Sequence, residues 1–196
     1  MLGMAFFKSL VKAHGKEYFE PIGQILYDAG IKKPNPLNPS HAWKLKGPMS
    51  AYARWWVGQR LSGAASPQLP RMPRDLRRYA ADACQYLSSQ CFEISGAMRT
   101  YQLKLADRQC AMTDLSRRIQ NAVVILCTSL YAARRDDEPT QIAASAVCRE
   151  LWQQLTGDRS TNRDWRRLTE LGGALAESGW TELQGIGSEE IMMPYK

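Results

Sequence analysis

The chain has 196 residues, with 26 lysines and arginines against 19 acidic residues, and its net charge at pH 7 is +7. Hydrophobic residues at 44% and charged residues at 23% are typical of a soluble globular protein with a core to bury. This composition excludes a wholly disordered chain, a collagen-like chain and a disulfide scaffold. The longest apolar stretch without a charge, residues 120–133, is shorter than the roughly 20 residues that a membrane span needs.

The cysteines indicate the compartment. Five cysteines occur without a CxxC pair, and Lys8 interrupts the apolar start of the chain before it reaches the length of a signal-peptide core. An odd number of scattered cysteines is typical of reduced intracellular thiols. We therefore expect a cytoplasmic protein, with peripheral attachment to the inner face of the membrane as an alternative.

The charge is distributed unevenly. Residues 1–75 contain 11 basic and 4 acidic residues, whereas residues 76–196 contain 15 of each. This difference predicts two regions with different surfaces. We call residues 1–75 the basic arm, and we expect residues 76–196 to form an electrically balanced helical domain with a C-terminal tail.

The basic arm begins with a predicted amphipathic helix over residues 2–18. Three lysines recur every four residues and share one face, and apolar side chains lie on another. A second helix is predicted from Pro21 to Gly30, followed by a proline-rich linker over 32–48 and a short tryptophan-containing helix over 49–61. The side chains expected to face a membrane or a partner are Lys8, Lys12, Lys16, Phe6, Phe7, Leu10, Trp43, Trp55 and Trp56.

The second region has the clearest pattern of the chain. Apolar residues at gaps of three and four predict helices over about 76–105, 110–135, 138–155 and 162–178. Four helices with short connections predict an all-α fold, an antiparallel four-helix bundle preceded by the basic helical and proline-rich arm. The expected core residues of the last two helices are Ile142, Val147, Leu151, Leu155, Trp165, Leu168, Leu171 and Leu175.

The sequence contains no set of residues typical of an active site. The two histidines, His14 and His41, have no cysteine or carboxylate at metal-ligand spacing, and we interpret His14 as an ordinary helix-face residue. No glycine-rich phosphate loop and no GxSxG elbow is present. We therefore predict no catalytic, cofactor-binding or metal-ligating residue.

Four stretches share the order and character of a known helical domain. They are residues 62–69 (SGAASPQL), 79–93 (YAADACQYLSSQCFE), 115–135 (LSRRIQNAVVILCTSLYAARR) and 144–155 (ASAVCRELWQQL). Together they resemble the C-terminal helical domain of acyl-CoA dehydrogenases of the very-long-chain type, the flavoproteins of fatty-acid β-oxidation.

The resemblance implies a non-catalytic part of a larger enzyme. In that family the FAD, the acyl-CoA pocket and the catalytic glutamate lie upstream of this domain, and nothing in this chain matches their motifs. The resemblance therefore implies FAD in the parent enzyme and none on this chain alone. It also implies packing on a flavoprotein catalytic domain, in cis or in trans, and support for a homodimer or for membrane-surface association.

Two other hypotheses stay open. The first is that the chain is a free-standing helical binding module, which uses its basic arm on an anionic membrane or on an acidic protein partner. Nucleic-acid binding is the least favoured hypothesis, because residues 76–196 match their cations with acids and only the arm has a basic field.

Overall fold

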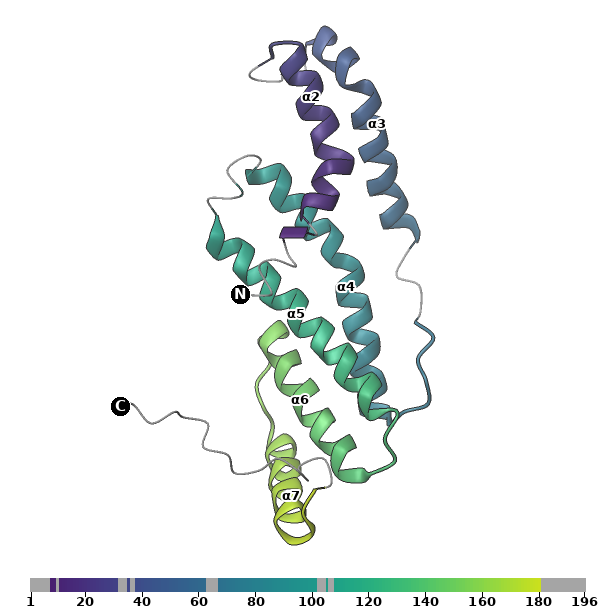
Figure 1. Cartoon of the computed structure of the whole chain (residues 1–196), viewed down its shortest axis with the longest axis vertical. Coiled ribbons are helices and arrows are strands. Elements are labelled where there is room, and N and C mark those ends of the chain that lie inside the picture. The colour runs from purple at the N-terminus through teal and green to yellow at the C-terminus, as the bar shows by residue number, and fades with distance from the viewer. Residues whose placement is uncertain are drawn as a thin grey trace, which may run out of the picture.

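The computed structural model describes residues 8–9, 11–31, 35, 38–62, 67–101, 105 and 108–180, and that part of the chain is helical without a β-strand. This confirms the predicted all-α class. The elements are η1 (Gly15–Phe19, a π-helical turn), α2 (Glu20–Asp28), α3 (Pro39–Ser62), α4 (Arg74–Tyr101), α5 (Gln109–Ala132), α6 (Glu138–Thr156) and α7 (Asn162–Ser178). Helices α2 and α3 form a hairpin beside one end of α4, α5 runs alongside α4, and α6 and α7 lie toward the other end of α4 (Figure 1).

Helices α4, α5 and α6 pack on one another, and we call them the body. One core cluster joins all three helices through Leu76, Ile125 and Cys148, which are almost completely buried. A second cluster lies farther along α4 and α5, around Ile94 and Ile119. Burial of such aliphatic side chains is the main source of stability, at roughly 1.5 to 3 kcal/mol each.

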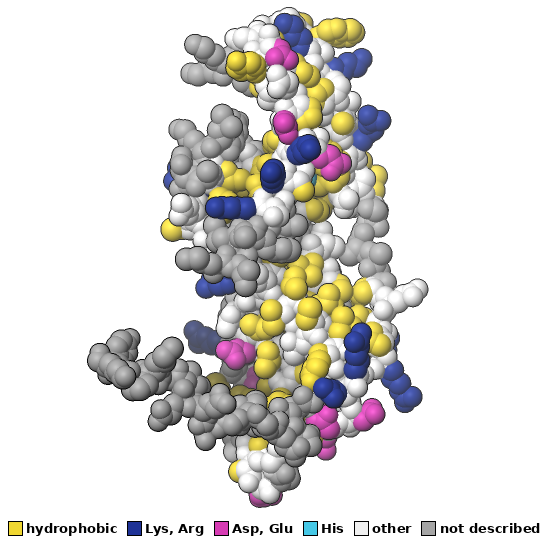
Figure 2. Space-filling model, viewed as in Figure 1, with side chains coloured by type: hydrophobic (Ala, Val, Ile, Leu, Met, Phe, Trp, Pro, Cys, Tyr) yellow, Lys and Arg dark blue, Asp and Glu magenta, His cyan; other side chains and the backbone are white. Residues whose placement is uncertain are grey.

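Small residues occupy much of this core, which differs from the sequence prediction. On α6 the fully buried positions are Thr140, Ala144 and Cys148, whereas Val147, a predicted core residue, is 44% exposed. Small side chains let helix backbones approach closely, so the larger residues are displaced to the margins of the contact. Figure 2 accordingly shows apolar side chains gathered on the surface over α5 and α6.

The ends of the helices follow the sequence signals. Asp137 caps α6 by accepting a hydrogen bond from the Thr140 backbone N–H, and Pro139 lies in the first turn. The side chain of Thr161 and the carboxylate of Asp164 cap α7 reciprocally. These two starts confirm the predicted connections on either side of α6.

The prediction for the core face of α7 is correct for its second half only. Leu171 and Leu175 are half-buried, whereas Trp165 is 57% exposed and Leu168 is also exposed. In the first half of α7 the half-buried positions are Asp164 and Arg167, which form ion pairs: Arg149 Nε lies 3.4 Å from Asp164 Oδ2, and Arg167 Nη1 lies 2.7 Å from Asp75 Oδ2. The hydrogen bond from Arg167 holds the pKa of the Asp75 carboxyl below its ordinary value. The four-helix bundle stays a prediction, since the mutually packed helices are those of the body.

The hairpin is more helical than the sequence indicated. Gly30 has the left-handed φ of 64° expected after α2, but α3 begins at Pro39 and includes most of the predicted linker. Asn38 Oδ1 accepts hydrogen bonds from the Ser40 backbone and hydroxyl, so it caps α3, and Pro39 suits a first turn. Pro48 is tolerated inside α3 because Gly47 before it has no Cβ to clash with the proline ring. Within the described residues, no helix is both long and apolar enough to cross a bilayer.

Candidate binding surface

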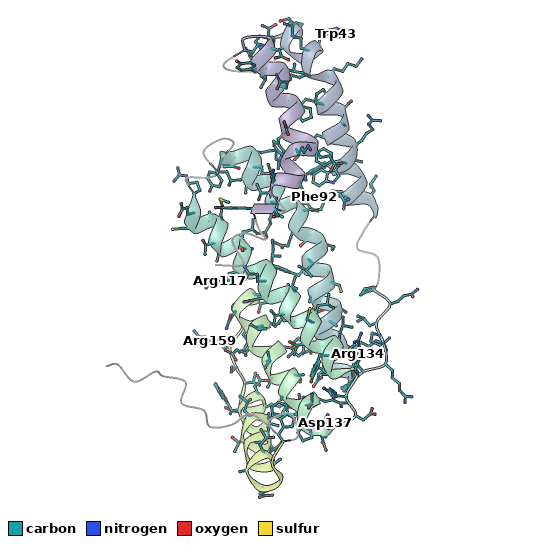
Figure 3. The ribbon with its side chains drawn as sticks, in the orientation of Figure 1. Trp43, Phe92, Arg117, Arg134, Asp137 and Arg159 are labelled. Carbon is teal, nitrogen blue, oxygen red and sulfur yellow. The ribbon has the colours of Figure 1, made fainter. Side chains whose placement is uncertain are left out.

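A cluster of aromatic rings attaches the hairpin to the body. The ring of Trp55 on α3 lies 4.8 Å from that of His14, 5.1 Å from that of Tyr18 and 6.1 Å from that of Phe92 on α4. Figure 3 shows Phe92 where the hairpin meets α4. Tilted ring pairs at these separations each contribute about 0.5 to 1.5 kcal/mol beyond the area they bury.

Polar contacts extend the same attachment. The hydroxyl of Tyr52 on α3 lies 2.6 Å from the hydroxyl of Ser95 on α4, and Ser95 is only 1% exposed. The guanidinium of Arg60 lies over the rings of both Trp56 and Phe92, at 4.9 and 5.6 Å from their centres. The inward face of α3 is therefore occupied by contacts with the rest of the protein.

His14 lies inside this cluster and not on an ordinary exposed helix face. Its Nε2 atom is buried and has no hydrogen-bond partner among the described residues. Burial lowers the pKa of the imidazole, while the nearby Glu17 carboxylate acts in the opposite direction. Protonation of His14 therefore opposes the docked state of the hairpin.

The outward face of α3 is apolar and basic. Trp43 is 74% exposed and Leu61 is 82% exposed, and the ammonium of Lys46 lies 5.1 Å from the centre of the Trp43 ring. No acidic residue occurs between Asp28 and Asp75, and eight cations fall in that interval. They are Lys32, Lys33, Lys44, Lys46, Arg54, Arg60, Arg71 and Arg74.

The ion pairs of the described residues lie outside the hairpin. The ion pairs of the described residues join partners within α4 to α7, and none of them includes a cation of α3 or a lysine of the first helical turns. Figure 2 shows lysine and arginine side chains along the outer edge of α3. The positive field of the protein is therefore concentrated on the hairpin and left uncompensated there.

The structure separates the residues predicted for a membrane or partner surface. Lys8, Lys12 and Lys16 are exposed, as is Trp43. Trp55 and Trp56 are half-buried against α4, so they hold the hairpin in place. The remaining predicted surface residues, Phe6, Phe7 and Leu10, lie outside the described residues.

The sequence analysis did not identify the residues of α4 that contact the hairpin. Phe92 lies beside the apolar stripe of α4 and not on it, and Ser95 is a small polar residue that no hydrophobic pattern selects. A large aromatic residue one position off a core stripe indicates a second packing face. That signal, together with Tyr52 and Trp55 three residues apart, is sufficient to suggest the contact.

The described residues contain no group of histidines, cysteines or carboxylates that could hold a metal ion. All five cysteines are free. Burial raises the pKa of the Cys84, Cys91 and Cys148 thiols, which disfavours the nucleophilic thiolate. The arrangement supports binding through charge and exposed apolar side chains.

No protein-family model matches the sequence, and searches of curated proteins and of solved structures find no match either.

Proposed function

We propose that the chain is a non-catalytic helical binding module, in which the body supports the hairpin and the basic surface of the arm binds an anionic partner. The observation that carries this proposal is the charge of α3. It contains Lys44, Lys46, Arg54 and Arg60 and no acidic residue, and among the described residues none of these four cations forms an ion pair.

Unpaired cations next to exposed aromatic side chains support this function physically. Uncompensated positive charge steers negatively charged partners toward the surface and accelerates association. Tryptophan and arginine are enriched among the residues that dominate binding energy at protein interfaces. An acidic protein and an anionic membrane are the two partner classes for the arm. We propose a cytoplasmic location, with attachment to the inner membrane face in the second case.

The test uses the full chain and two anionic probes. Binding to poly-L-glutamate and to phosphatidylserine-containing vesicles is measured at low and at high salt. We expect at least one probe to bind, and the triple variant K8Q/K12Q/K16Q to weaken binding, since each lysine near an anionic surface contributes about 1 kcal/mol at low salt. The control R134Q/R159Q/R166Q removes the same charge from exposed positions outside the arm, in the connections on either side of α6 and on α7. The proposal is wrong if neither probe binds or if only the control variant weakens binding.

A second candidate is the helical part of an FAD-dependent acyl-CoA dehydrogenase, which the sequence resemblance implies. The supporting observation is the exposure of Val124 on α5 and Val147 on α6, which lie on a surface that a catalytic domain could cover. We propose in this case that α7 completes a four-helix bundle, that the bundle packs on the flavoprotein and supports a dimer, and that the flavin is held by the partner.

The intact mass of the native protein tests this second candidate function. The protein is isolated from its source with an antibody against the body, and its intact mass and flavin absorbance are recorded. A mass well above 22.1 kDa with flavin bound supports the dehydrogenase. A mass of 22.1 kDa without associated flavoprotein contradicts it.

A further inference from the structure

The outward face of α3 is a continuous surface opposite the one that docks on the body. Trp43, Lys46, Ser50, Arg54, Val57 and Leu61 recur at gaps of three and four, so they share one side of the helix. The positions facing inward are His41, Leu45, Pro48, Tyr52 and Trp55, all of them half-buried. The outward side chains are exposed, so a partner can reach them without displacing the hairpin.

Apolar side chains lie at both ends of this face. Trp43 is close to the start of α3, and Leu61 is close to its end, with Val57 one turn before it. At 1.5 Å per residue, Trp43 and Leu61 are about 27 Å apart along the helix axis. A second helix of about 18 residues has the same length and could contact both ends at once.

Positive charge lies between these apolar ends. Lys46 and Arg54 are on the outward face, Lys44 and Arg60 are elsewhere on the exposed surface of α3, and α3 contains no acidic residue. Within the described part of the chain, no carboxylate forms an ion pair with any of the four. A complementary partner therefore carries carboxylates at its centre and apolar side chains toward its ends.

The pattern fits a protein helix better than a lipid surface. An interfacial helix buries a wide uninterrupted apolar face in the bilayer. On α3 that face is interrupted by Ser50 and Arg54, so inserting Trp43 and Leu61 together would carry a guanidinium into the apolar layer. A partner helix can instead place a carboxylate at this position.

Nucleic acid fits less well for a reason of charge density. Double-stranded DNA carries about one negative charge per 1.7 Å of axis, which is many more than Lys46 and Arg54 can match along α3. We propose, building on the proposed binding function, that the outward face of α3 docks an acidic amphipathic helix of another protein.

The test measures binding of the full chain to a synthetic 20-residue helix with leucines near both ends and glutamates between them. A scrambled peptide of the same composition is the peptide control. We expect K46E/R54E to weaken binding roughly tenfold or more, since attraction becomes repulsion. The control R134E/R159E makes the same change of charge in the connections on either side of α6 and is expected to leave binding unchanged. A peptide with lysines in place of the glutamates is expected to recover binding to K46E/R54E.

The inference is wrong if K46E/R54E binds the peptide as tightly as the wild type does, or if the scrambled peptide binds as tightly as the designed one. It is also wrong if phosphatidylserine vesicles bind and the peptide does not, or if an oligonucleotide binds more tightly than the peptide. Dependence on Lys8, Lys12 and Lys16 alone also overturns it, yet leaves the proposed binding function intact. If neither the peptide, the vesicles nor poly-L-glutamate binds, the proposed function itself fails. Circular dichroism and urea unfolding of each variant confirm that the fold is retained.

Discussion

The body and the hairpin are both helical, but they are stabilised in different ways. The body closes around fully buried side chains such as Ile125 and Cys148, and some of its surface cations pair with carboxylates, for example Arg118 with Glu93. No residue of η1 or α2, and no described side chain of α3, is fully buried. The hairpin is held by ring contacts and a hydroxyl pair along one face. Because this attachment uses only one face, the other face of α3 is left available for a partner.

The largest expected effect comes from the core of the body. Ile125→Ala leaves a cavity at a fully buried position, and we expect it to lower the free energy of unfolding by about 3 kcal/mol. Urea unfolding followed by circular dichroism measures the change. Val124→Ala, at the exposed neighbouring position, is the control and is expected to cost much less. Equal costs at the two positions would contradict the position of the core.

A smaller and more local effect is expected at the junction. Phe92→Ala removes the ring that contacts both Trp55 and Trp56, and we expect a loss of about 2 kcal/mol, since the ring is only half-buried. Hydrogen exchange should accelerate in α3 and stay slow in α5 and α6. Equal acceleration in all three helices would mean that hairpin and body unfold as one unit.

The hydroxyl pair should contribute less than the ring contacts. Tyr52→Phe leaves the buried Ser95 hydroxyl without its partner across the junction, at an expected cost of about 1 kcal/mol. A double-mutant cycle with Ser95→Ala separates the pair from its surroundings, and we expect the second substitution to cost little once the first is present. Additive losses would show that the two hydroxyls act independently.

The smallest expected effect is a pH dependence of hairpin docking. Burial lowers the pKa of His14 below its ordinary value of 6.5, although Glu17 partly opposes this shift. The unfolded or undocked state therefore takes up the proton first, so stability is greatest above pH 6.5 and falls as the pH drops below it. Unfolding midpoints measured at pH 7.5 and pH 5.5 check the sign. His14→Phe should flatten this dependence, whereas His41→Gln, near the start of α3 and outside the ring cluster, should not.

The sequence allowed the helices and their ends to be predicted wherever short-range chemistry decides them. The predicted helix starts at residues 138 and 162 and the predicted helix end near Gly30 depend on neighbouring residues only. The structure has caps at Asp137 and Thr161 and a left-handed Gly30. The start of α3 was not predicted, because four prolines between residues 34 and 48 indicated a linker. The local signal that outweighs them is Asn38 followed by Pro39, a cap and a first-turn residue.

Tertiary contacts were harder to predict, for two physical reasons. Hydrophobic patterns favour large residues, so Val147 was placed in the core while Ala144 and Cys148 fill it. The ion pair between Arg167 of α7 and Asp75 was not predicted, because the two residues are distant in sequence. Trp55 was likewise not assigned to the junction, since its partner Phe92 lies on another helix and the signal at Phe92 was missed.

The central claim is that α3 has one face for the body and one for a partner, and two tryptophans test it directly. Trp43→Ala should weaken binding of the acidic helical peptide roughly tenfold, and should change the free energy of unfolding by no more than about 0.5 kcal/mol. Trp55→Ala should lower that free energy by about 2 kcal/mol, because it removes ring contacts to both His14 and Phe92. Unchanged peptide binding by Trp43→Ala, or equal losses of stability from the two substitutions, would contradict the division of α3 into two faces.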